Sequence, residues 1–192
     1  METWCEYRKG ANMALGTWFL NHKCGNKDNR KMCFYTKEPK YRQLIPSQSN
    51  FRLEEDSSLL YDGLHGDFSV LLGGNWRFEL VVDTQTGLCT QIRSFLQQMD
   101  VTEANLVIPK SEQKDLFFCS DTELVAGGGC HYFPFQNSIL WDEKKRILCF
   151  GNPNSEGHKV HFIPQVYAII HSGQLECVFM DLQHINRDIS FE

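Results

Sequence analysis

The sequence lacks the features that mark several classes of protein. Its net charge of −5 gives no excess of Lys and Arg of the kind that binds nucleic acid phosphates. No run of apolar residues approaches the ~18 that a membrane-spanning helix needs, and residues 1–20 lack the basic and then apolar order of a secretory signal. We therefore predict a protein of the cytoplasm that binds neither nucleic acid nor a membrane.

Cysteine pairs of the CxxC type are also missing, although the chain has eight cysteines. That spacing is typical of zinc sites and of redox-active dithiols, while an even number of cysteines suits a disulfide framework in a secreted protein. Since we find no secretory signal, we predict free thiols, several of them buried. A signal removed by processing would favour disulfides instead.

The bulk composition is that of an ordinary globular protein, with 42% hydrophobic and 22% charged residues among 192. A chain of this length can bury a core of its own, and we predict a single domain over 1–192. The weakest point is the polar segment 37–50, which holds Pro39 and Pro46.

Helical periodicity is scarce, and alternation of apolar and polar residues dominates. Segment 75–96 reads as a hairpin in which Leu80 faces Ile92 and Glu79 faces Arg93. Another hairpin over 164–182 turns at Ser172 and Gly173.

In that second hairpin we expect three facing pairs, all on one side of the sheet. These pairs are Ile170 with Leu175, Ala168 with Cys177 and Val166 with Phe179. A third hairpin is expected over 138–153, and one or two helical turns over 57–64 and 95–106. The predicted fold is mainly β, an antiparallel sandwich or barrel built from consecutive hairpins with one or two short helices.

Three glycines precede Cys130 and His131 in the segment 127–131. A phosphate-binding loop needs GxxxxGK[ST] followed by a helix, and here strand-like residues follow instead. We predict a bulge or a close approach of two backbones, with an anion-binding nest of backbone amides as the alternative. Cys130 is a candidate nucleophile, but adjacent residues of a strand point to opposite faces, so His131 cannot be its base without a bend.

Two further groups of polar residues are candidate sites. His158 and His161 could join a cysteine or carboxylate in a zinc site, yet in a strand their spacing of three places them on opposite faces. Asp62 and His65 lie in a glycine-rich stretch and could act as general acid and base, although Asp and Gly are also the usual residues of turns.

Aromatic residues make up 12% of the chain. They are numerous enough to line a ligand cavity, and we single out Trp18, Trp76, Tyr132 and Trp141. We predict a binding domain without chemistry of its own, which takes a small molecule in such a cavity or a protein on a sheet face. No cofactor is predicted. The alternative is a hydrolase that uses Cys130 as nucleophile or a metal held by His158 and His161.

Overall fold

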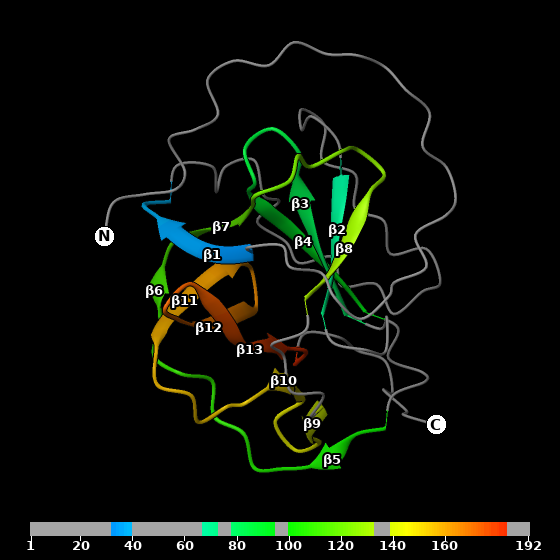
Figure 1. Cartoon of the computed structure of the whole chain (residues 1–192). Helices are drawn as coiled ribbons and strands as arrows, with labels where there is room; N and C mark the ends of the chain where they lie inside the picture. Colours follow the sequence, from blue (N-terminus) through cyan, green and yellow to red (C-terminus); the bar gives the residue numbers. More distant parts are fainter. Residues whose placement is uncertain (1–31, 40–66, 73–77, 95–99, 133–138, 184–192) are drawn as a thin grey trace.

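The computed structural model describes residues 32–39, 67–72, 78–94, 100–132 and 139–183. All regular structure in these ranges is β-strand, arranged in three sheets (Figure 1). The prediction of a mainly β fold rich in antiparallel pairs is therefore confirmed. The described residues contain no helix long and apolar enough to cross a membrane.

The largest sheet has seven strands in the order β5-β9-β10-β13-β12-β11-β6. Its central strands pair antiparallel, and the two short edge strands β5 and β6 pair parallel with their neighbours. The strands are β5 (Thr102–Glu103), β6 (Glu112–Gln113), β9 (Ile139–Asp142), β10 (Ile147–Gly151), β11 (His158–Ile163), β12 (Val166–His171) and β13 (Gln174–Asp181).

The other two sheets are smaller. A four-stranded sheet has the order β4-β3-β2-β8, and β1 pairs with β7 in a two-stranded sheet. The strands are β1 (Met32–Lys37), β2 (Asp67–Leu72), β3 (Phe78–Asp83), β4 (Cys89–Ser94), β7 (Asp115–Ser120) and β8 (Gly129–Tyr132). The pairing of β2 with β8 is parallel, so this sheet is not made of hairpins alone.

The hairpin of β3 and β4 has the register that its alternation predicts. Leu80 faces Ile92 and Glu79 faces Arg93, and the Arg93 guanidinium donates to the Glu79 carboxylate over 3.1 Å. The turn is held by Asp83, whose carboxylate accepts hydrogen bonds from the backbone amide and hydroxyl of Thr86.

The hairpin of β12 and β13 turns where predicted but changes register beyond its first pairs. Ser172 and Gly173 both have positive φ, 50° and 79°, as a two-residue type I′ turn requires. Ile170 faces Leu175 as expected, but Ala168 faces Val178 and Val166 faces Met180. A bulge at Glu176 causes this one-residue shift, so the expected pairs with Cys177 and Phe179 are wrong.

The third predicted hairpin is also present, as β9, a turn over 143–146 and β10. The short helix expected over 95–106 does not form in its described part, where β5 lies instead. The other expected helix, over 57–64, lies outside the described residues.

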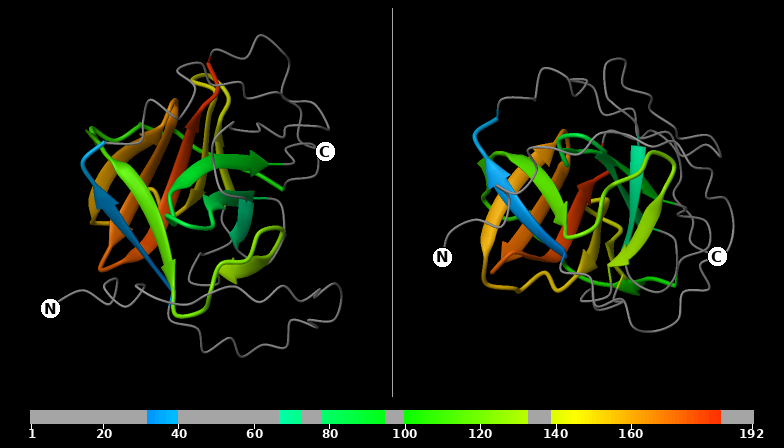
Figure 2. Two further views of the ribbon diagram at one scale, coloured as in Figure 1. Left: turned by 90° about the horizontal axis from the view of Figure 1, so that it is seen from above. Right: turned by 45° about the horizontal axis from the view of Figure 1, so that its top comes forward.

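One core joins the three sheets in a sandwich-like arrangement (Figure 2). The face of the seven-stranded sheet that points into this core, called here the inner face, carries side chains such as Leu148, Phe150 and Val178. Phe150 stacks on Phe78 of the four-stranded sheet with ring centroids 4.4 Å apart. The described strands of each sheet do not close on themselves.

Within the described residues, the opposite, outer face of the seven-stranded sheet is covered by the segment 104–108, which we call the strap. It begins after edge strand β5 and leads to β6 at the other edge, as the green segment at the bottom and left of Figure 1 shows. Leu106 is its buried side chain, 3% exposed, while Val107 is 74% exposed. The buried cluster beneath the strap contains Ile147, Cys149, Ile169, Cys177 and Phe179.

Candidate functional site

The thiol of Cys130 lies in the core. Its strand β8 is an edge of the four-stranded sheet, and the residue is 5% exposed. Its Sγ lies 3.7 Å from the Sδ of Met32. The environment is thus that of a small apolar side chain, and a thiolate there would lose its hydration. Asp62 and His65, the other candidate catalytic residues, lie outside the described part of the chain.

The triple glycine allows two backbones to come close together. Gly127 has φ of 74°, and the amide of Gly128 donates to the carbonyl of Val125 over 2.8 Å, closing a turn. The carbonyl of Gly128 then accepts from the amide of Ser69 over 2.9 Å, which starts the parallel pairing of β2 with β8. A Cβ on Gly129 would lie 3.0 Å from the Ser69 carbonyl oxygen. The predicted close approach of backbones is confirmed, and the turn uses the amide of Gly128.

His158 and His161 are divided between the two faces of β11. Val160 between them points into the inner core, whereas the His161 ring stacks on Tyr167, a residue that packs against the outer cluster. The centroids of these two rings are 4.7 Å apart. His158 is exposed, with Nε2 4.0 Å from a carboxylate oxygen of Glu112. Within the described ranges no group of three His, Cys, Asp or Glu side chains could hold a metal ion.

Two of the four aromatic residues singled out from the sequence are buried, and the other two, Trp18 and Trp76, lie outside the described residues. Trp141 is 7% exposed and Tyr132 is 1% exposed, both in the inner core. The Tyr132 hydroxyl accepts a hydrogen bond from the backbone amide of Leu175 over 2.9 Å, which ties β8 to the start of β13. Burial raises the pKa of Tyr132 to about 12.

A surface that the sequence did not suggest lies where the sheets meet near the end of β1. We call it the corner surface and define it by Tyr35, Lys37, Glu38, Glu112, Lys114 and His158. Ion pairs connect several of these residues, since the Lys114 ammonium binds the Glu38 carboxylate and lies 3.7 Å from that of Glu112. The hydrogen bond to Glu38 raises the pKa of Lys114.

The aromatic part of the corner surface is a stack that carries a cation. The Tyr35 and Phe117 rings are nearly parallel at 12°, with centroids 5.2 Å apart. The Lys37 ammonium lies 5.3 Å from the first centroid and 5.2 Å from the second, within the range of a cation–π contact. Alternation along β1 could have shown that Tyr35 and Lys37 share a face, but not that β7 supplies the second ring.

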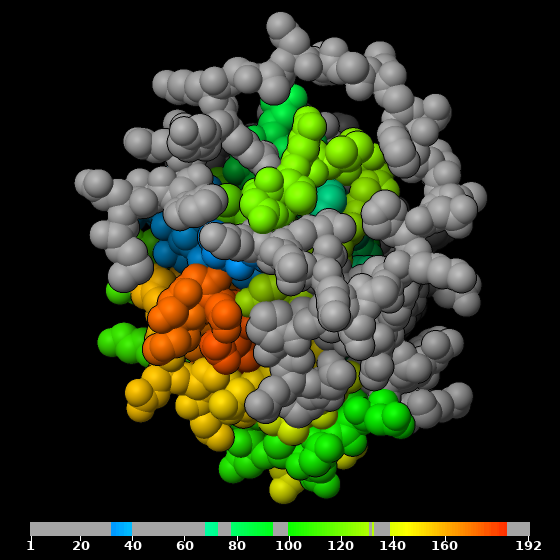
Figure 3. All heavy atoms as spheres, viewed as in Figure 1, coloured from blue at the N-terminus to red at the C-terminus, as the bar shows by residue number. Residues whose placement is uncertain are grey.

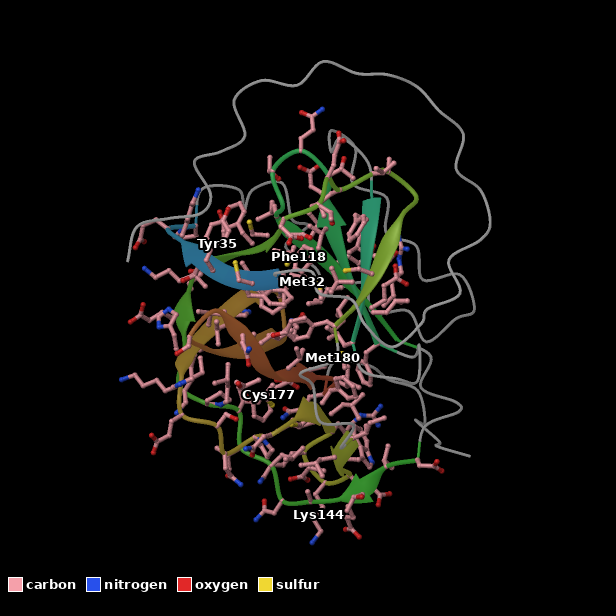
Figure 4. All side chains as sticks on the ribbon, in the orientation of Figure 1. Met32, Tyr35, Phe118, Lys144, Cys177 and Met180 are labelled. Carbon is pink, nitrogen blue, oxygen red and sulfur yellow. The ribbon has the colours of Figure 1, made fainter. Side chains whose placement is uncertain are left out.

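The corner surface is held in place by the neighbouring hairpin. The amide of Phe34 donates to the carbonyl of Gly173 over 2.7 Å, so β1 rests on the β12 and β13 turn. Figure 3 shows the orange spheres of this turn directly below the blue spheres of β1. In Figure 4, Tyr35 is labelled on β1 at the left of the view and Lys144 at the bottom, near β5.

No protein-family model matches this chain, and no curated protein matches its sequence.

Proposed function

We propose that this protein is a binding domain without chemistry of its own, and that it recognises a protein partner through the corner surface. The observation that carries the proposal is the half-buried Tyr35 ring, which stacks on the buried Phe117 ring and lies beneath exposed Lys37. Tyrosine is enriched at protein interfaces because it offers a large, stiff contact area with a polar tip.

The charges beside the stack support the same role. Lys37 lies over the Tyr35 ring, and Lys114 pairs with both Glu38 and Glu112, so the surface combines an aromatic ring with charges of both signs. Tyrosine is among the residues that most often supply a large share of the binding energy of an interface. The Cys130 thiol and the Tyr132 and Trp141 rings are packed in the core, which favours a partner on the surface over a small molecule within.

Site-specific photo-crosslinking tests this proposal. A benzophenone side chain placed at Tyr35 should crosslink one protein from the native cell, while the same group at exposed Lys144 should not. The charge reversal Lys37→Glu, combined with Tyr35→Ala, should abolish capture of that protein, and Lys144→Glu should leave it unchanged. Circular dichroism and the melting temperature check that each variant is folded.

Two outcomes would overturn the proposal. One is equal crosslinking from both positions, because it would indicate contact without specificity. The other is a partner whose capture survives the double substitution. A melting temperature raised by a metabolite, with no protein captured, would return the function to a small ligand. Cell fractionation tests the cytoplasmic location that accompanies the proposal.

A further inference from the structure

Two cysteines lie side by side in the outer face of the seven-stranded sheet. Cys149 is on β10 and Cys177 on the adjacent strand β13, and their Sγ atoms are 3.2 Å apart. Both residues are fully buried, with 0% exposure. A hydrogen bond between two thiols explains the contact, and a disulfide would need the sulfurs to approach to about 2.05 Å.

The bulge at Glu176 is what brings this pair together. Leu175 points to the inner core, so uninterrupted alternation would send Cys177 to that face as well. The extra residue reverses the alternation and places Cys177 in the outer cluster with Cys149. The two thiols therefore lie on the same face of the sheet because of the bulge at Glu176.

The strap closes over the cluster that contains both thiols. Leu106 packs into this cluster, and its backbone is held at both polar atoms by the β9 and β10 turn. The amide of Leu106 donates to the Asp142 carboxylate over 2.9 Å, and its carbonyl accepts from the Lys145 ammonium over 2.7 Å. Lys145 also donates to the side-chain oxygen of Asn105.

We propose that Cys149 and Cys177 are a redox modification site, at which the two thiols join in a disulfide that links β10 to β13, and that the strap controls access to it. With oxidised glutathione as the oxidant, one cysteine thiolate attacks a glutathione sulfur and releases the first glutathione. The second cysteine thiolate then attacks the protein sulfur of the mixed disulfide and releases the second. Two protein thiols are oxidised, one glutathione disulfide is reduced, and the two thiol protons end on the two glutathiones.

The closed strap makes this reaction slow. Burial raises the pKa of Cys177, and the thiolate is the attacking species, so the pair is poorly reactive while Leu106 is in place. Local opening of the strap would admit both water and oxidant without unfolding the sheet beneath.

A second pair of cysteines in the same chain gives a matched comparison. Cys33 and Cys119 face each other across β1 and β7, and both are partly exposed. Any disulfide between them requires no movement of the strap. Their oxidation rate should therefore be independent of Leu106 and its contacts.

Peptide mapping under non-reducing conditions tests the disulfide itself. The folded protein is incubated with oxidised glutathione, and a second sample is refolded in a glutathione redox buffer. We expect a peptide that links Cys149 to Cys177, absent from Cys149→Ser and present in Cys33→Ser. The proposal is overturned if both cysteines are still alkylated after refolding, or if each pairs with a different cysteine.

The rate of disulfide formation tests the strap. Lys145→Ala should accelerate formation about tenfold, the effect expected when opening costs about 1.4 kcal/mol less, whereas Lys144→Ala in the same turn should not. Buried Cys89 in the inner core reports global unfolding through its own alkylation. Equal acceleration at Cys89, or no acceleration by Lys145→Ala, would overturn control by the strap.

Discussion

The two faces of the seven-stranded sheet are covered in different ways. On the inner face, side chains from three sheets interlock, and the Tyr132 hydroxyl accepts the Leu175 amide over 2.9 Å. On the outer face, among the residues that the structure describes, one segment lies over the cluster, and the Asp142 carboxylate accepts a hydrogen bond from the Leu106 amide over the same 2.9 Å. The two hydrogen bonds have equal length, but the first lies in a core between sheets and the second joins the strap to the turn between β9 and β10. From this difference we expect the outer face to be the part of this sheet that opens locally.

The largest effect should come from the inner face. Phe150→Ala removes a ring that stacks on Phe78 between two sheets, and the cavity left there cannot collapse easily. We expect a loss of about 3–5 kcal/mol in the free energy of unfolding, measured by urea denaturation. A loss smaller than that of the strap substitution described next would show that the inner face is not the more rigid one.

Leu106→Ala should reduce the free energy of unfolding less than Phe150→Ala does, although the Leu106 side chain is as well buried as that of Phe150. The strap can move inward to fill part of the space, so we expect about 2 kcal/mol, the low end for a buried leucine. Hydrogen exchange should rise at 104–108 and remain unchanged in β10. The neighbour Val107→Ala is the control, and its exposed side chain predicts a change within about 0.5 kcal/mol. Uniform protection loss across the sheet would contradict local opening.

The same comparison explains what the sequence could predict. Alternation in 75–96 is regular, and it placed Glu79 opposite Arg93 correctly. The hairpin over 164–182 has an equally good turn, but one extra residue at Glu176 shifts the register, and period-two patterns contain no signal for a single bulge. The pattern therefore placed Cys177 on the same face as Ala168, whereas the bulge turns it to the outer face beside Cys149.

Contacts between strands that are distant in the sequence could not be predicted either, because a local pattern does not show which strands pair. Tyr35 meets Phe117 only because β1 pairs with β7, and the two residues are 82 positions apart in the sequence (117 − 35). Residues 100–106 suggested a helical turn but form β5 and part of the strap, because pairing with β9 and contact with Asp142 outweigh a short local preference.

Alkaline pH should weaken the inner contact. Burial raises the pKa of Tyr132 from 10.0 to about 12, so the folded state resists ionisation of the phenol. The stability from this group is fully present below about pH 10 and is lost as pH rises through about 12. Tyr132→Phe leaves the Leu175 amide without its acceptor and should cost about 1–3 kcal/mol at neutral pH.

In the alkaline range the unfolding free energies of the wild type and the Tyr132→Phe variant should converge. The Tyr132→Phe variant lacks the titrating phenol, so its unfolding free energy should fall less steeply than that of the wild type between about pH 10 and about pH 12. Chemical denaturation across that range measures the two slopes. Parallel slopes would mean that Tyr132 ionises as easily in the folded as in the unfolded chain.

Acid should weaken the hydrogen bond between Asp142 and the strap, and we expect this effect to be the smallest of the four predicted here. Hydrogen bonds from the backbone amides of Lys145 and Leu106 and the nearby Lys145 ammonium hold the pKa of Asp142 below its ordinary 3.8. A lowered pKa stabilises the fold above the ordinary value, and this contribution is lost as pH falls through the folded pKa. Asp142→Asn should therefore melt below the wild type near about pH 6 and approach it near about pH 3. Glu143→Gln, in the same turn but exposed, should show no such convergence. If acid increased hydrogen exchange in β8 as much as in the strap, the loss of stability would belong to the whole fold. That result would contradict separate, local opening of the strap.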